Sequence, residues 1–176
     1  FVELNDLPKV QAAIKDACVK NNICGTILIA PEGINGTIAG VGEKLTNIIT
    51  VLDQIAGIKA GELKYSSSTG KPFLRMKVRM KKEIITMAAP EANPTKKVGQ
   101  YVEAADWNAL INDPEVTLID TRNDYETAVG IFKGAIDPDI QKFTDFKKFV
   151  SEKMDPAKQK KVAMFCTGGI RCEKAS

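Results

Sequence analysis

The segment from Lys161 to Arg171 constrains the fold of this chain more than any other part of the sequence. Lys161-Val-Ala-Met-Phe165 has the composition of a short buried strand, and it runs directly into Cys166-Thr-Gly-Gly-Ile-Arg171. A strand that leads through a glycine loop into a helix is typical of α/β domains, whose functional loops lie at the carboxyl ends of parallel strands. With a second buried strand at Val116–Asp120, residues 98–176 predict an α/β domain with a parallel sheet. Its helices are expected at Ala104–Ile111 and Phe143–Met154.

The first half of the chain has a different order of elements. Apolar residues recur at helical spacing over Leu7–Asn22 and Glu43–Ala56, with strand-like segments before and after each helix. The order βαββαβ predicts an α+β domain of the ferredoxin-like (acylphosphatase-like) type over residues 1–89, joined to the second domain by a Pro- and Lys-containing linker over 90–97. The strands are expected at Phe1–Leu4, Gly25–Ala30, Thr37–Ala39, Glu62–Ser66 and Phe73–Ile85, with a turn at Pro31–Gly36.

Composition excludes several kinds of site. The chain has no histidine, so these residues hold no Ser-His-Asp triad, Cys-His dyad, histidine zinc site or two-His-one-carboxylate iron site. No run approaches the roughly 18 consecutive apolar residues of a membrane span, and no signal peptide opens the sequence. The four cysteines are too few and too scattered for a disulfide framework. We therefore expect a cytoplasmic protein with no metal site and no cofactor identifiable from sequence.

The loop after the second buried strand has the features of a site for a reactive thiol. Gly168 and Gly169 allow the loop to curl so that successive N–H groups point at one spot, and the following helix adds its positive N-terminal end. Both effects favour a thiolate at Cys166 over a thiol, and the thiolate is the nucleophile. Arg171 would close the loop and complement a bound anion. The alternative is a buried structural cysteine in a glycine turn. The complete candidate loop is Cys166, Thr167, Gly168, Gly169, Ile170 and Arg171.

Other polar residues are assigned supporting roles. Cys172 could resolve a persulfide or a disulfide on Cys166, although simple burial is the alternative. Asp120 and Arg122 could orient the active loop, or form a structural ion pair. Cys18 and Cys24 are expected in the core. Gly33 and Gly36 are expected in a turn, because no P-loop or dinucleotide pattern surrounds them.

A basic strip in the first half suggests contact with nucleic acid. Residues 1–97 hold 14 Lys/Arg and 9 Asp/Glu, whereas residues 98–176 hold 11 and 13. Within the first half, Arg75, Lys77, Arg79 and Lys81 alternate with Leu74, Met76, Val78 and Met80. A strand would place the four cations on one face and the four apolar side chains on the other. Such a strip can track RNA phosphates, or it can be a solvated edge.

At these residues the sequence resembles known families. Leu118–Glu126 and Gly130–Ala135 resemble the body of a rhodanese domain, and Cys166–Arg171 resembles its active loop, in which the cysteine carries sulfur as a persulfide. Four residues separate Cys166 from Arg171, as in sulfurtransferase loops. Cysteine phosphatases have five there and a histidine before the cysteine, where this chain has Phe165.

The resemblance extends over nearly the whole chain. Four segments together are similar to the rhodanese-containing tRNA uridine hydroxylase family: Ala30-Pro-Glu-Gly-Ile-Asn-Gly36, Trp107-Asn-Ala-Leu110, Ile119–Glu126 and Met164-Phe-Cys-Thr-Gly-Gly-Ile-Arg-Cys-Glu-Lys174. The family implies oxygen-dependent conversion of the wobble uridine (position 34) of tRNA to 5-hydroxyuridine, with molecular oxygen as co-substrate, tRNA rather than DNA as partner, and the catalytic cysteine at Cys166.

Two further expectations accompany this resemblance. The sequence starts on a strand-like stretch and stops where a helix begins, so we expect a rhodanese-like domain truncated at its C-terminus, and an isolated chain of this length to be inactive. The alternative function is a rhodanese-type sulfurtransferase that passes persulfide sulfur to an acceptor. A non-catalytic binding module is the third class, and the intact loop from Cys166 to Arg171 argues against it.

Overall fold

The computed structural model describes residues 1–176, which divide into two compact units, Phe1–Ile84 and Ile85–Ser176. The division therefore falls earlier than the boundary expected at residue 89. Met87 and Ala89 are buried in the core of the second unit, and Ala92 packs against that core. The segment 90–97, expected to be a linker, thus lies inside the second unit because the apolar residues around it are buried there.

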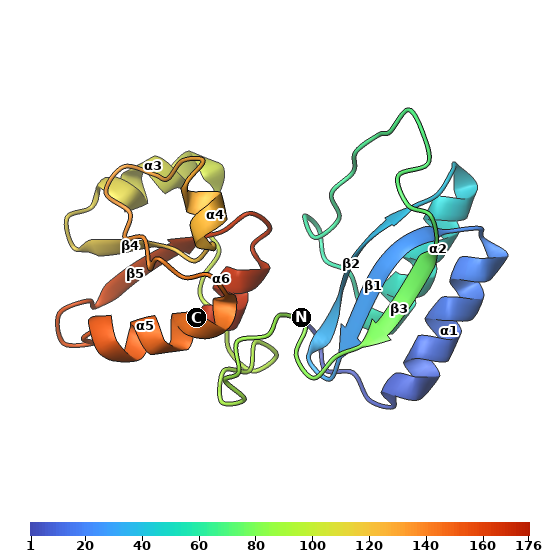
Figure 1. Ribbon diagram of the computed structural model, residues 1–176, viewed down its shortest axis with the longest axis horizontal. Coiled ribbons are helices and arrows are strands. Elements are labelled where there is room, and N and C mark those ends of the chain that lie inside the picture. The colour runs from blue at the N-terminus through green and yellow to red at the C-terminus, as the bar shows by residue number, and fades with distance from the viewer. The chain divides into compact units, whose positions relative to one another are not determined.

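The first unit is a three-stranded sheet with two helices (Figure 1). β1 (Cys24–Ala30) pairs antiparallel with β2 (Gly33–Ala39) and parallel with β3 (Met76–Met80), so the strand order is β2-β1-β3. α1 (Leu7–Lys20) and α2 (Glu43–Ala56) contact each other and supply apolar residues to one core with the strands. Both helices follow the predicted apolar spacing.

The core of this unit accounts for the helical periodicity. One face of each helix packs on the apolar side of the sheet, and burial of this apolar surface is the main favourable contribution to folding. The β1–β2 hairpin also needs close backbone contact, because a Cβ at Gly36 would collide with the Thr26 carbonyl oxygen across the hairpin. The buried core residues are Ile14, Cys18, Ile23, Ile27, Ile29, Ile48, Leu52 and Val78.

Two strands predicted in the first unit differ in the structure. Glu62–Ser66 is an exposed loop without strand pairing, since no neighbouring strand offers its backbone a partner. Of Phe73–Ile85, only β3 is a strand, although the Arg75 carbonyl and the Lys81 N–H extend its hydrogen bonds to β1. The apolar alternation is also shorter than predicted: Leu74 is 93% exposed and Met80 is 48% exposed.

The start of the chain and the hairpin turn are also corrected. Phe1–Leu4 is not a strand, but the N–H groups of Val2 and Leu4 donate to the carbonyls of Glu32 and Pro31 at 3.0 and 2.9 Å. The turn occupies only Pro31 and Glu32, so Gly33 and Gly36 lie in β2 rather than in the turn. The Glu32 carboxylate accepts the Ile84 N–H at 2.7 Å, which joins the turn to the end of the unit.

The second unit is built on two parallel strands, as predicted. β4 (Val116–Asp120) and β5 (Lys161–Phe165) pair in register, with Asp120 opposite Phe165. Ile136 adds a short bridge beside Ile119 on the other side of β4. The predicted helix Phe143–Met154 is divided into a 3-10 turn and a helix. The helical segments are α3 (Ala104–Asn112), α4 (Asp124–Thr127), η1 (Phe143–Asp145), α5 (Phe146–Lys153) and α6 (Ile170–Ala175).

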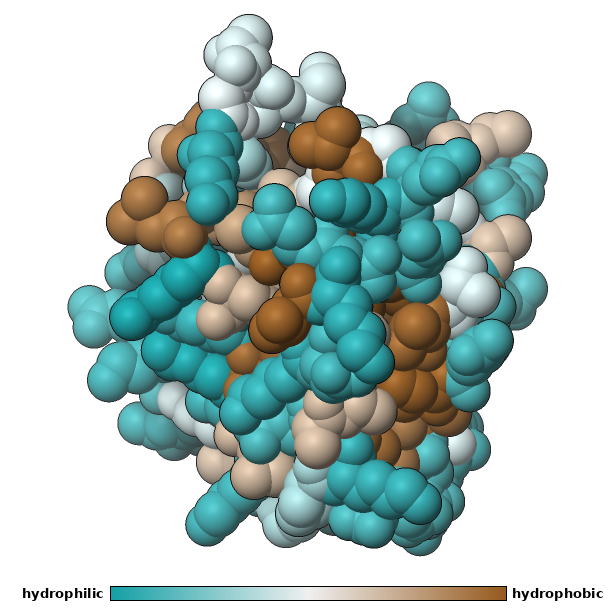
Figure 2. Space-filling model, turned by 90° about the vertical axis from the view of Figure 1, so that its right-hand side faces the viewer, coloured by the Kyte–Doolittle hydropathy of each residue, from teal (hydrophilic) through white to brown (hydrophobic).

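Hydrophilic side chains cover most of the face in Figure 2, and hydrophobic ones form separate patches between them. The most exposed apolar residues, Leu74, Val129 and Val41, are spread along the sequence. No helix of the chain is both long enough and apolar enough to span a membrane.

Candidate active site

Cys166 follows directly on β5, at the carboxyl end of the parallel pair. The residues Cys166–Gly169 form the loop between this strand and α6, and Gly169 has a φ of 83°. That left-handed conformation suits glycine, because a side chain would be strained there. It turns the Gly169 N–H back toward Cys166, to whose Sγ it donates at 2.9 Å. The predicted curl of the glycine loop is thus present in the structure.

The surroundings of Cys166 stabilise its thiolate. A hydrogen bond from the Cys172 thiol contributes most to lowering the pKa of Cys166, burial opposes it, and the N–H groups of Cys172, Arg171 and Gly168 lower it further. The pKa of Cys172 is correspondingly raised, because its thiol donates to the Cys166 sulfur and is itself buried. Both shifts favour a proton on Cys172 and a thiolate on Cys166, and the thiolate is the nucleophilic form of a cysteine.

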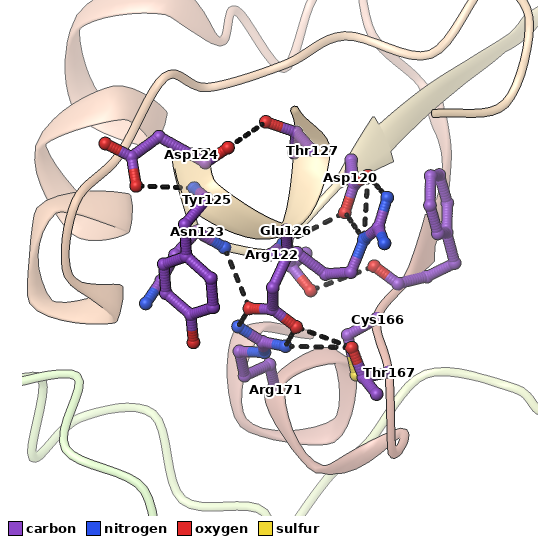
Figure 3. Close-up of polar contacts among 12 residues, drawn as sticks. Asp120, Arg122, Asn123, Asp124, Tyr125, Glu126, Thr127, Cys166, Thr167 and Arg171 are labelled. Atoms are coloured by element: carbon purple, nitrogen blue, oxygen red, sulfur yellow. Dashed lines mark hydrogen bonds and ion pairs between the residues drawn. The ribbon is translucent and has the colours of Figure 1, made fainter. Parts of the chain in front are cut away.

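Arg171 binds a carboxylate that the sequence did not single out. Its Nη1 and Nη2 atoms donate to the two carboxylate oxygens of Glu126 at 2.6 and 2.7 Å, and the Thr167 hydroxyl donates to the same carboxylate at 2.5 Å (Figure 3). The Arg171 and Glu126 side chains are only 11% and 16% exposed. The pKa of Glu126 is lowered to about 2. The hydrogen bonds from Arg171 are the largest cause, and the hydrogen bond from Thr167 lowers the pKa further.

This arrangement changes the expected role of Arg171. We expected it to close the loop and face a bound anion, but its planar fork is occupied by Glu126. The hydrogen bonds to Glu126 are the main cause of the raised pKa of Arg171, and the charge of the nearby Cys166 sulfur raises it further. Glu126 was part of the segment Ile119–Glu126, and its position three residues after Asn123, in a capping box, is the signal that could have identified it as ordered.

Asp120 and Arg122 form the predicted pair beside the loop. Asp120 is fully buried at the end of β4, and its carboxylate accepts from Arg122 Nε and Nη2 at distances between 2.7 and 3.0 Å. Arg122 Nη2 also donates to the Gly130 carbonyl at 2.6 Å. The guanidinium carbon lies 5.6 Å from the centre of the Phe165 ring, within the range of a cation–π contact. The pair thus holds the Arg122 guanidinium beside the residue that precedes Cys166.

A pocket of about 330 Å³ opens next to Cys166. Its walls are Arg122, Gly130, Ile131, Phe132, Phe165 and Cys166. Phe132 and Phe165 meet edge to face with centroids 4.8 Å apart, and Trp107 lies 5.8 Å from Phe132 and 6.3 Å from Phe165. The sequence does not indicate that these aromatic residues form a cluster, because they come from three separate segments of the chain.

The remaining predicted residues lie outside this loop region or support it. Cys18 is buried in the first unit, where burial raises the pKa of its thiol to about 11. Cys172 lies in α6, with its Sγ 3.5 Å from the Thr121 hydroxyl. Ile170 begins α6.

The basic strip Arg75, Lys77, Arg79 and Lys81 belongs to the first unit and takes part in no ion pair. No group of three or more His, Cys, Asp or Glu side chains is placed to hold a metal ion.

The Arg171–Glu126 pair predicts a dependence of stability on pH. The folded pKa of Glu126, about 2, lies below its unfolded value of about 4.3. The pair therefore contributes its full stability above the unfolded pKa and loses it as the pH falls toward 2. Glu126→Gln should lower the unfolding free energy at neutral pH by roughly 1.5–3 kcal/mol. Urea unfolding of the 176-residue chain, followed by the fluorescence of Trp107, its one tryptophan, measures this change in free energy.

Glu152→Gln is the matched control for that experiment. Glu152 pairs with Lys148 at 3.9 Å, and both side chains are more than half exposed, so its loss should change the unfolding free energy by less than about 1 kcal/mol. Equal effects of the two substitutions, or an unchanged acid dependence in Glu126→Gln, would contradict the structural role of the pair.

The thiolate environment predicts selective alkylation. Cys166 should react with iodoacetamide faster than Cys18, Cys24 or Cys172 at neutral pH, and its rate should rise with a midpoint below the value of about 8.5 for a free cysteine. Cys172→Ala should raise that midpoint because it removes the thiol donor, whereas Cys172→Ser keeps a donor and should raise it less. Peptide mapping by mass spectrometry gives the four rates. A Cys166 that reacts no faster than the others would refute the stabilised thiolate.

Comparisons with known proteins agree with this architecture. The family model described as the UPF0176 acylphosphatase like domain matches residues 1–84, which are the first unit. A protein of Teredinibacter turnerae named tRNA uridine(34) hydroxylase is 49% identical over all 176 residues of the chain. The chain spans about half the length of this relative, 55%. The first unit therefore corresponds to the UPF0176 acylphosphatase like domain, and the whole chain is similar to the matching part of the protein named tRNA uridine(34) hydroxylase.

Proposed function

We propose that the protein is a tRNA-modifying enzyme that hydroxylates C5 of the wobble uridine, with Cys166 as its catalytic nucleophile. The observation that carries this proposal is a stabilised cysteine thiolate beside an open pocket. All 176 residues of the chain that holds it align with part of a protein named tRNA uridine(34) hydroxylase. A tRNA substrate would place the reaction in the cytoplasm. In this proposal the second unit is a rhodanese-like catalytic domain and the first unit contributes to binding tRNA.

The overall reaction balances with molecular oxygen as the oxidant. The C5–H bond of uridine is replaced by a C5–OH bond, and one oxygen atom of O₂ enters the product. The second oxygen atom leaves as water, which requires two electrons and two protons from a reductant, for which we propose two thiols that become a disulfide. In this chain, Cys166 would act on the base, Arg171 would hold the loop through Glu126, and Cys172 would keep the proton that Cys166 lacks.

A sulfurtransferase is the second candidate, and one observation favours it. The N–H groups that surround the Cys166 sulfur can equally stabilise the terminal anion of a cysteine persulfide, because they are fixed donors around a negative charge. The two activities differ in product: hydroxylation gives 5-hydroxyuridine, whereas sulfur transfer to the same base gives a thiouridine.

Nucleoside analysis of tRNA tests this proposal. Cells that lack the gene should lose 5-hydroxyuridine derivatives and keep 2-thiouridine, and the full-length protein should restore them. Cys166→Ser should abolish the restoration, because a hydroxyl is not ionised at neutral pH. Arg171→Lys should reduce it substantially, because an ammonium group cannot donate to both Glu126 oxygens in the same plane. Loss of 2-thiouridine instead would favour the sulfurtransferase, and restoration by Cys166→Ser would refute the nucleophile.

The basic strip of the first unit is the proposed contact to the tRNA backbone. Arg75, Lys77, Arg79 and Lys81 lie along the segment that pairs with β1, and no carboxylate neutralises them in an ion pair. Cations in such a row bind phosphates with an affinity that falls as salt rises, since binding releases counterions.

Replacing all four cations with Gln should therefore weaken tRNA binding and flatten its salt dependence, while circular dichroism shows an unchanged fold. Filter binding of tRNA to the full-length protein at several salt concentrations measures both quantities. As a control, Lys148→Gln removes a cation of the second unit that is 75% exposed, and binding should be little changed. Equal affinity and equal salt slope in the fourfold variant would leave the strip as a solvated edge.

A further inference from the structure

The pocket beside Cys166 has the chemistry of a site for a planar base. Its wall is largely apolar and aromatic, with Phe132 45% exposed at the surface and Phe165 behind it. An exposed ring of this kind offers a face for stacking a nucleobase. The pocket volume of about 330 Å³ is at the small end of ligand sites, about 300–1,000 Å³. It is therefore suited to one ring rather than to a large cofactor.

Arg122 provides the polar group of this pocket. Its Nε and Nη2 atoms are held by Asp120 and the Gly130 carbonyl, so the guanidinium is fixed in position. Nη1 takes part in none of these hydrogen bonds, and its donors remain for a ligand. A carbonyl oxygen is the natural acceptor for them, and uracil carries two. Cys166 completes the wall next to this cation.

We infer that this pocket binds the uracil ring of the substrate, stacked on Phe132, and that the Cys166 thiolate adds to C6 of that ring. The inference rests on the proposed function for the identity of the substrate and adds the site and the covalent step. C6 of uracil is electrophilic, because it is conjugated through the C5–C6 double bond to the C4 carbonyl. A thiolate held at the edge of the ring is a suitable nucleophile for it.

The covalent step needs no oxidant. The bond from Sγ to C6 forms while the C5–C6 π bond breaks, and its electron pair moves to C5 and the O4 oxygen as an enolate. The positive charge of Arg122 stabilises this enolate, since preorganised donors act most strongly where charge develops. C5 then is nucleophilic and accepts an electrophile. In the hydroxylation this electrophile is O₂, which adds as a peroxide whose outer oxygen atom the two thiols of the proposed reaction reduce to water; without oxygen it is a proton from solvent. Loss of the original C5 proton and departure of the thiolate restore the double bond.

This step can be measured without oxygen. Full-length protein and an anticodon stem–loop with a wobble uridine are incubated in D₂O under anaerobic conditions, and the deuterium at C5 is measured by mass spectrometry of nucleosides. Wild-type protein should exchange the C5 hydrogen, and Cys166→Ser should not. Phe132→Leu keeps an apolar side chain but loses the ring, and exchange should fall roughly tenfold or more. Phe132→Tyr keeps the ring and should retain most of the exchange.

Binding gives a second measurement that is independent of chemistry. Trp107, the only tryptophan among residues 1–176, lies 5.8 Å from Phe132, so a base stacked on Phe132 should change its fluorescence. The stem–loop should produce this change in wild-type protein and Phe132→Tyr and a much weaker one in Phe132→Leu.

The two proposals fail in different ways. Hydroxylation in air without anaerobic exchange, or exchange and fluorescence changes that are equal in Phe132→Leu and wild type, would overturn the pocket inference and leave the proposed function standing. Exchange that depends on Cys166 and Phe132, without hydroxylation in air, would support the pocket and overturn the proposed reaction.

Discussion

The bidentate ion pair between Arg171 and Glu126 holds the loop Cys166–Gly169 in its place. Arg171 lies in α6, directly after the loop, whereas Glu126 lies in α4, after β4. The pair therefore joins the two segments that follow the two parallel strands. Because both side chains are largely buried, removing one leaves an uncompensated charge, which makes the contact costly to break. Thr167 donates to the same carboxylate and so fixes the loop from a second position.

The stability of the Cys166 thiolate depends on the loop conformation that these contacts with Glu126 hold. Hydrogen bonds stabilise a sulfur anion most when the N–H groups are already oriented toward it. In a flexible loop, part of this stabilisation would be spent on ordering the backbone. The Gly169 N–H reaches the sulfur because the backbone is held on one side by β5 and on the other by α6. The Cys172 thiol, in the first turn of α6, donates a further hydrogen bond to the Cys166 sulfur. The environment of the Cys166 sulfur is therefore a local structure of the loop, stabilised by one long-range ion pair.

Arg122 has a comparable position on the other side of Cys166. A fully buried Asp120 is tolerated at the end of β4 because Arg122 donates to both of its oxygens. The same guanidinium stands beside Phe165 and lines the pocket. One ion pair thus satisfies a buried carboxylate, and its remaining donors are available at the site. The aromatic residues beside it come from α3, from the segment after α4 and from β5, so they meet only in the folded domain.

The sequence alone determined the local elements that carry the chemistry. Periodicity predicted α2 and β5 with correct ends, and the parallel pairing of β4 and β5 followed from the alternation of strands and helices. The loop Cys166–Arg171 was recognisable because its properties depend on neighbours within six residues. Periodicity failed at Glu62–Ser66, since a strand needs a pairing partner that local sequence does not reveal. Tertiary structure alone decided that Glu126 occupies the Arg171 fork and that Trp107, Phe132 and Phe165 form one cluster. These contacts join residues far apart in the chain, and their geometry depends on how the whole domain packs.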